Sequence, residues 1–360
     1  MGKVKYNEMT LLKILALASV LFFHCYRPFL GEGIHWKVVI PDGNPTLVDW
    51  LSHLYTFNKV FDVHCLFFCS GFLYFMTMSS GTRTVLEQLI RRSRRIIVPY
   101  LTVGLLYFVP LYTIFSVPSG VHQANDSLWA GYWEFLTMHF SDHMWFLQVM
   151  LVITVIVLLL NNAFKRFFLP LLLGCFLMTF VFNRYLGDIG FMSLCSMSDN
   201  LFLFVLGGAA FRWFCYFKSN ANWIIMAVSG AIFFTTYNIS PEKGTLLAEI
   251  NSVAVDGSVC VFALSLARLV ADRAVDLLFR LRAVRYFDAN FMGFYIYHMP
   301  IPVVCAMYLY EPFKKVIDSD LLYVITAWII TLLLSALAVR TAAAIKSVSV
   351  KVPLLAKLYG

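Results

Sequence analysis

Long apolar runs alternate with short polar segments along almost the whole chain. Each run holds roughly 20 mostly apolar residues, the length that an α-helix needs to cross the hydrocarbon core of a membrane. The runs lie at residues 9–30, 51–79, 95–117, 144–163, 167–184, 198–216, 222–239, 248–270, 289–310 and 320–342. The pattern therefore predicts an all-α fold, a polytopic transmembrane helical bundle with about ten spans.

Composition excludes a water-soluble protein. Hydrophobic residues make up 60% and charged residues 13% of the 360 residues, and the mean hydropathy is +0.76. A typical soluble domain is about 45–50% apolar and about 25% charged. A globule in water has too little interior to bury this much apolar surface, so lipid must surround much of it. We expect residues 1–360 to form a single membrane domain, without a separate soluble domain.

Positive charge lies between the apolar runs rather than in one basic stripe, so the net charge of +8 does not indicate a nucleic-acid partner. If both termini are cytoplasmic, 21 of the 28 Lys and Arg residues fall on the cytoplasmic side. Short cytoplasmic loops of membrane proteins carry such an excess. The eight cysteines contain no C-x-x-C pair, so neither a zinc site nor a disulfide framework is predicted.

Ionisable side chains inside the spans are the first candidates for function, because charge at membrane depth is costly. Lys13 and His24 lie in the first span. Eleven helical steps bring them to nearly the same face, about 16 Å apart along the axis. Two simpler explanations remain open: Lys13 extends to the membrane surface, and His24 makes a hydrogen bond between helices.

The second span holds Asp62 and His64, followed by Ser70 and Gly71. A carboxylate in lipid needs a partner, and we expect His24, His64 or a basic group to supply it for Asp62. A structural ion pair explains Asp62 as well as a catalytic role does. The small residues Ser70 and Gly71 predict close helix packing.

Four arginines stand before the third span, at 91, 92, 94 and 95. They suit a ligand with several phosphates, such as coenzyme A, because guanidinium groups bind phosphate oxygens bidentately. They equally suit an anchor on anionic lipid.

Two further groups are predicted near the outer face. His143 and Trp145 open the fourth span, where a tryptophan also serves as an interfacial anchor. Tyr297 and His298 precede Pro300 in the ninth span, and the proline should kink the helix and release a carbonyl group. His24, His64 and His298 lack the i,i+3 or i,i+4 spacing of a metal motif, so no metal is expected.

In their order and spacing, these segments resemble the acyltransferase-3 family of integral-membrane acyltransferases over nearly the whole chain. The matching segments are Lys13 to His24, Phe67 to Phe72, Arg92 to Tyr100, His143 to Leu147, Leu203 to Gly207, and Tyr295 to Pro300. The family's first-span histidine corresponds to His24, and its basic partner to Lys13, where arginine is commoner. Its Arg-x-x-Arg corresponds to Arg92 and Arg95, or less naturally to Arg91 and Arg94.

This resemblance implies an acyl-coenzyme A-dependent O-acyltransferase of the bacterial cell membrane. It moves an acyl group, usually acetyl, to a hydroxyl of a cell-surface or lipid-linked glycan. His24 would be the base, Asp62 would orient it, and Tyr297 or His298 would stabilise the oxyanion. Lys13, Arg91, Arg92 and Arg95 would bind the donor, and His143 and Trp145 the acceptor. Direct transfer and an acyl-histidine both remain open. A transporter or flippase of a glycan or lipid-linked sugar is the alternative, and a receptor is a third interpretation.

Overall fold

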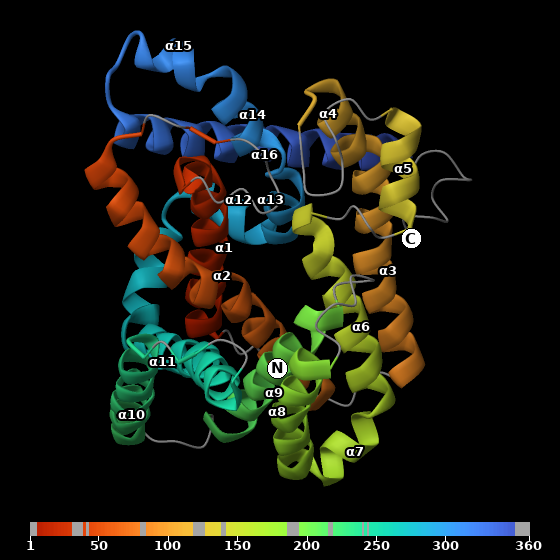
Figure 1. Ribbon diagram of the computed structural model, residues 1–360. Helices are drawn as coiled ribbons and strands as arrows, with labels where there is room; N and C mark the ends of the chain where they lie inside the picture. Colours follow the sequence, from red (N-terminus) through yellow and green to blue (C-terminus); the bar gives the residue numbers. More distant parts are fainter. Residues whose placement is uncertain are drawn as a thin grey trace. The chain divides into compact units, whose positions relative to one another are not determined.

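The computed structural model is helical wherever it has regular structure in its described ranges. These ranges are residues 6–30, 39–40, 43–79, 84–117, 127–137, 142–185, 194–214, 219–239, 241–242 and 245–349. The predicted all-α class is therefore confirmed for this part of the chain (Figure 1).

Contacts between residues divide the chain into two compact units, each assembled from separated segments. The first unit comprises Met1–Val20, Thr56–Thr102 and Glu134–Arg280. The second comprises Leu21–Tyr55, Val103–Trp133 and Leu281–Gly360. Helices α1 (Asn7–Tyr26), α2 (Pro45–Ser79) and α3 (Val85–Val103) each contribute residues to both. That the chain forms a single membrane domain stays a prediction.

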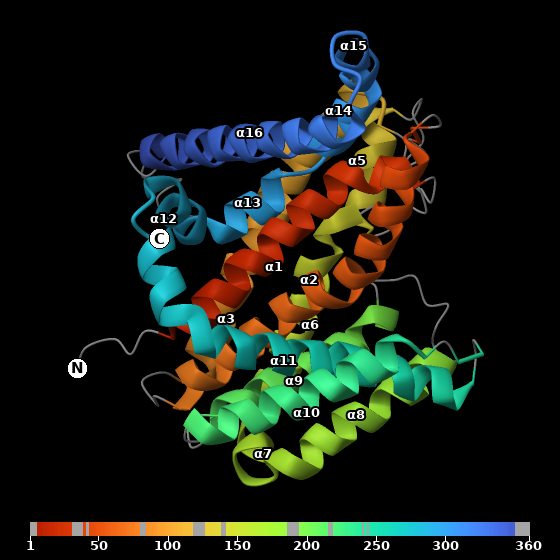
Figure 2. The ribbon, with the colours of Figure 1, turned by 90° about the vertical axis from the view of Figure 1, so that its left-hand side faces the viewer.

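In its described residues, the first unit contains six further helices besides its parts of α1 to α3. They are α6 (Trp145–Leu159), α7 (Asn161–Arg166), α8 (Phe168–Tyr185), α9 (Leu194–Phe214), α10 (Ser219–Tyr237) and α11 (Leu246–Leu278), with the short 3-10 turn η3 (Asp142–Met144) before α6. Helices α10 and α11 lie side by side in both ribbon views (Figures 1 and 2). Helix α9 contacts both α6 and α8.

The second unit contains the remaining elements. They are η1 (Arg27–Leu30), the π-helical turn η2 (Gly104–Phe108), α4 (Val109–Ile114), most of α5 (Leu128–Leu136), α12 (Arg282–Ala289), α13 (Phe291–Tyr297), α14 (Ile301–Tyr308), α15 (Tyr310–Lys314) and α16 (Asp320–Ser349). Both α13 and α14 pack against α16.

In the described residues, each of the ten predicted spans overlaps one helix or a run of consecutive helices. Five stretches in the described residues are long and apolar enough to cross a membrane: Asn7–Leu30, Pro45–Ser79, Leu86–Ile114, Leu246–Ala271 and Asp320–Ile345. The bent pair α13 and α14 makes a sixth if it is one span. Three shorter apolar helices are Trp145–Leu159, Phe168–Phe180 and Ala221–Tyr237. The number ten and the cytoplasmic termini stay predictions.

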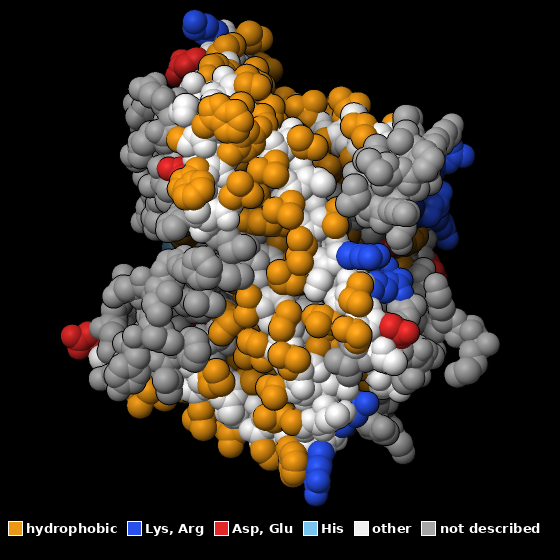
Figure 3. All heavy atoms as spheres, turned by 90° about the vertical axis from the view of Figure 1, so that its right-hand side faces the viewer, with side chains coloured by type: hydrophobic (Ala, Val, Ile, Leu, Met, Phe, Trp, Pro, Cys, Tyr) orange, Lys and Arg blue, Asp and Glu red, His pale blue; other side chains and the backbone are white. Residues whose placement is uncertain are grey.

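Large hydrophobic side chains remain exposed on many of these helices, such as Leu106, Leu159 and Leu247. Figure 3 shows one face on which hydrophobic side chains are widespread and the Lys and Arg side chains lie in a few separate groups. A water-soluble protein rarely exposes apolar patches of this extent, whereas a helix in lipid needs them.

Helices α2 and α9 approach so closely that glycine is required at their contact. A Cβ atom at Gly71 would overlap the carbonyl oxygen of Phe204, and one at Gly207 would overlap the carbonyl oxygen of Phe68. The close packing predicted for Gly71 is thus confirmed. It fixes α2 against α9 within the first unit.

A polar network precedes α16 in the second unit. The Asp320 carboxylate accepts hydrogen bonds from the Asn44 backbone at 2.7 Å, from the Tyr310 hydroxyl at 3.0 Å and from the Lys314 ammonium at 3.0 Å. Hydrogen bonds to Asp318 and Asp320 raise the pKa of Lys314 above its usual range. Lys314 therefore stays protonated up to the ordinary lysine pKa of about 10.4, and its contribution to stability is lost as the pH rises above that value.

Candidate functional site

Two buried histidines meet in the second unit. His24 lies near the end of α1, and His298 follows directly after α13. Their ring centroids are 5.0 Å apart and their planes are inclined by 33°. The rings of Phe23 and Tyr295 lie beside them, with centroids 5.0 Å from His24 and 5.8 Å from His298 respectively. The structure thus brings together two of the predicted catalytic residues in apolar surroundings.

The break between α13 and α14 orients His298. Helix α13 ends at Tyr297, and Pro300 precedes α14, so regular helical hydrogen bonding stops between them. The predicted kink is confirmed, since the two helices meet at an angle of 40°. The Tyr295 carbonyl lies 2.6 Å from Nδ1 of His298. A carbonyl only accepts hydrogen bonds, so Nδ1 carries the proton, and Nε2 of the neutral ring keeps the basic lone pair.

Tyr297 is held by a residue that the sequence did not single out. The hydroxyl of Tyr107 donates a hydrogen bond of 2.7 Å to the Tyr297 carbonyl, and the two rings meet edge to face with centroids 5.1 Å apart. Tyr107 lies in η2, and π-helical turns occur frequently at functional sites. The run of residues around Tyr107 reads as ordinary apolar helix, so no pattern marked it in advance.

Asp62 lies in the first unit and is buried. Its Oδ1 accepts a hydrogen bond from the Val63 backbone at 2.5 Å. His64 itself pairs with Asp256 of α11, with 3.2 Å between Nδ1 and Oδ1. The ion pair of His64 is thus with Asp256, and the partner expected for Asp62 stays a prediction. Asp256 was missed, although a carboxylate in the interior of the apolar run 248–270 was a usable signal.

The basic residues of the first unit occupy different environments. Arg92 is half-buried, with its guanidinium 4.4 Å from the centre of the Tyr74 ring. Arg91 and Arg95 are exposed on the same helix, α3. Lys13 is half-buried on α1, which runs unbroken from Asn7 through His24 to Tyr26, so the predicted helical link between Lys13 and His24 is present.

The pair predicted to bind the acceptor opens α6. His143 is buried in η3. Trp145 is half-buried, and its ring lies 6.2 Å from that of Phe67 on α2. Both side chains therefore contribute to packing in the first unit, and their role toward a substrate stays a prediction.

Taken together, apolar helices of membrane-spanning length and buried histidines define a membrane protein with the side chains for proton transfer. Residues 6–340 match the family model described as an acyltransferase domain, and the chain belongs to this acyltransferase-3 family. No curated protein and no solved structure matches it. Family membership favours acyl transfer over the transporter and receptor interpretations.

Proposed function

We propose that this membrane acyltransferase transfers an acyl group, most simply acetyl, from acyl-coenzyme A to a hydroxyl of a cell-surface or lipid-linked glycan at the bacterial cytoplasmic membrane. The observation that carries the proposal is the buried pair of His24 and His298. An imidazole suits this reaction because its ordinary pKa lies near neutral pH, so one side chain can accept and then return a proton.

The reaction balances with a single proton. Neutral His24 removes the proton of the acceptor hydroxyl as its oxygen attacks the thioester carbonyl carbon. The C–S bond then breaks, the ester forms, and the coenzyme A thiolate takes the proton from the imidazolium of His24. Apolar surroundings limit water at the thioester, which reduces hydrolysis.

His298 assists this step in the proposal. With Nδ1 engaged by Tyr295, neutral His298 offers a basic Nε2, so only its protonated form can donate a hydrogen bond from Nε2 to an oxyanion. The proposal places a single proton on the pair, because two imidazolium rings with centroids 5.0 Å apart would repel each other. In this mechanism His24 and His298 together accept and return the proton. The Tyr297 hydroxyl is the candidate neutral group that donates a hydrogen bond to the oxyanion.

Donor binding is assigned to the basic residues. Coenzyme A is a polyanion, and Arg92 and Arg95 stand one helical turn apart on α3, with Arg91 beside them. Tyr74 holds the Arg92 guanidinium in a fixed position, which lowers the entropy lost on binding phosphate. Lys13 is proposed to contribute a further positive charge. Asp62 is proposed to act on His64, and His143 and Trp145 to contact the acceptor.

The catalytic assignment is tested with purified full-length protein and acyl-coenzyme A labelled in its acyl group. His24→Ala is expected to lower kcat for transfer by about 10²- to 10⁴-fold, the usual contribution of a general base. His53→Ala is the matched control, because His53 is exposed on α2. Full activity of His24→Ala, in protein that unfolds at the same temperature as wild type, would remove His24 from the mechanism.

The donor assignment is tested in the same assay. Arg95→Ala is expected to raise the KM for acyl-coenzyme A about tenfold with little change in kcat, because one charge-assisted hydrogen bond to phosphate is lost. Arg166→Ala is the control, because Arg166 is an exposed arginine outside this cluster. An unchanged KM for Arg95→Ala and Arg92→Ala would leave these arginines as lipid anchors.

A further inference from the structure

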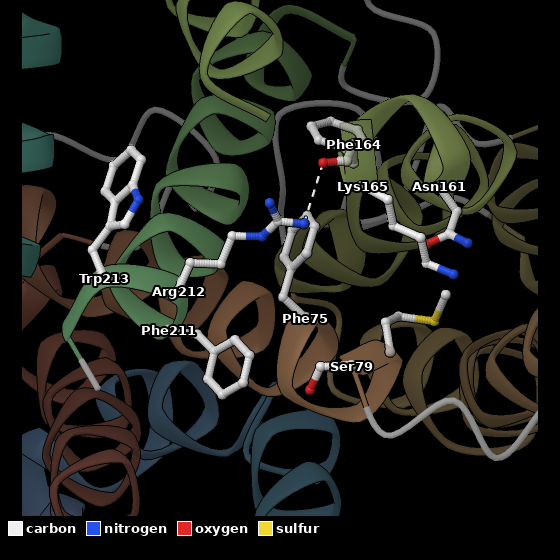
Figure 4. Close-up of a pocket in the computed structure, with 9 residues that line it drawn as sticks. Phe75, Ser79, Asn161, Phe164, Lys165, Phe211, Arg212 and Trp213 are labelled. Atoms are coloured by element: carbon white, nitrogen blue, oxygen red, sulfur yellow. Dashed lines mark hydrogen bonds between the residues drawn. The ribbon is translucent and has the colours of Figure 1, made fainter. Parts of the chain in front are cut away.

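A cavity of about 560 Å³ opens within the first unit, where α2 and α9 end and α7 begins (Figure 4). Small-molecule sites typically enclose about 300–1,000 Å³. The cavity includes none of the residues assigned above to catalysis, to the donor or to the acceptor. The roles assigned so far therefore give this cavity no function.

Aromatic rings form the apolar part of the wall. Phe75 of α2 is buried, and its ring packs against those of Phe164 and Phe168, with centroids 5.7 and 5.4 Å away. Phe211 and Trp213 of α9 also line the cavity (Figure 4). Because Phe75 is held by two other rings, this part of the wall is formed before any ligand binds.

Two cations line the same cavity. The guanidinium of Arg212 donates a hydrogen bond of 3.2 Å from Nη2 to the Phe164 carbonyl and lies 4.3 Å from the centre of the Phe168 ring. These contacts fix the group, and it has further N–H donors besides the one that Phe164 accepts. Lys165 of α7 is exposed at the cavity. The nine described residues that line it include no carboxylate.

The remaining polar group is a neutral amide. Asn161 is buried at the start of α7 and lines the cavity beside Lys165 (Figure 4). Two cations, an amide and aromatic walls together match the chemistry of a phosphate group attached to an apolar or ring-containing body. A purely apolar ligand would form no ion pair with either cation. A simple inorganic anion would make no contact with the aromatic wall.

We propose that this cavity binds an anionic phosphate ester, with its phosphate between Lys165 and Arg212 and its remaining part against Phe75 and Trp213. Two sources share this chemistry. One is the headgroup of an acidic phospholipid, since Lys165 and Arg212 belong to the basic residues that the positive-inside rule places at the cytoplasmic surface. The other is the nucleotide part of coenzyme A, and that source rests on the proposed function.

The coenzyme A source has a structural link to the proposed donor site. Tyr74 holds the Arg92 guanidinium, and the next residue of α2, Phe75, lines the cavity. The rings of Tyr74 and Phe75 are themselves in contact, with centroids 5.2 Å apart. Neighbouring residues near the end of α2 thus contact the Arg92 guanidinium and line the cavity.

The experiment measures binding by purified full-length protein in neutral detergent. Coenzyme A is titrated calorimetrically, and phosphatidylglycerol and phosphatidylcholine are compared by native mass spectrometry. Lys165→Gln is expected to weaken coenzyme A or phosphatidylglycerol about tenfold, because a charge-assisted hydrogen bond to phosphate is lost, while zwitterionic phosphatidylcholine changes little. Arg166→Gln is the matched control, since Arg166 is the next residue, is exposed, and its guanidinium lies over the Phe167 ring outside the cavity.

Each outcome decides the proposal. Weakened binding of either anionic ligand by Lys165→Gln but not by Arg166→Gln supports it and identifies the source. Equal effects of the two variants on both ligands overturn it. Arg212→Gln adds a second test, which is informative only if that variant unfolds at the wild-type temperature, because Arg212 also holds Phe164. If coenzyme A binding depends on Arg95 but not on Lys165, the proposed donor stands and the cavity proposal fails for coenzyme A.

Discussion

At the scale of single residues, the proposed chemistry depends on which nitrogen atoms of the two histidines make hydrogen bonds. The Nδ1–H of His298 donates a hydrogen bond to the Tyr295 carbonyl, and both residues lie at the end of α13, just before Pro300. His24 gains its partner from the other end of the sequence. Neither relation follows from the residue types alone.

The His24–His298 contact predicts non-additive kinetics. His24→Ala and His298→Ala should each lower kcat for acyl transfer, and the double variant should be about as active as the weaker single variant, because residues that act as one unit lose their function once. A double-mutant cycle on kcat, with thermal unfolding of each variant as the folding control, measures this coupling. Effects that multiply would show that the two rings work independently.

At the scale of elements, a close contact between two helices positions α2 against α9. Glycine at the α2–α9 contact lets two backbones approach, and aromatic rings fill the space beside it, for example Tyr74 against Phe204 with centroids 5.4 Å apart. The sequence predicted that Gly71 permits close packing, but not which helix would contact it. The structure identifies that helix as α9, because the Phe204 carbonyl lies against Gly71.

The α2–α9 contact predicts a sharp difference between two glycines. Gly207→Ala should destabilise the protein by about 1–3 kcal/mol, since its Cβ would overlap the Phe68 carbonyl and the helices would have to move apart. Gly174→Ala on α8 should be neutral or slightly stabilising, because no atom lies within 4 Å of its Cβ and alanine favours a helix. Thermal unfolding in detergent compares the two; equal melting temperatures would contradict the close approach.

At the scale of the whole molecule, orientation in the membrane is a question of charge distribution. Basic residues concentrate in alternate loops, which predicts that both termini face the cytoplasm. Reporter fusions to the first and last residues should therefore show cytoplasmic activity, and a periplasmic reporter should be silent at both ends. Activity of the periplasmic reporter at either end would show that the predicted number or direction of the spans is wrong.

The sequence by itself determined the all-α membrane class, the position of each apolar helix and the side chains worth testing. These are local properties, since the length of an apolar run, a proline in a helix and a charge in lipid act over neighbouring residues. Only the tertiary structure decided the pairings: His24 with His298, His64 with Asp256, Tyr107 with Tyr297, and Lys165 with Arg212 around one cavity. Such pairings join helices far apart in the chain, and the packing of whole surfaces selects them, which no local pattern encodes.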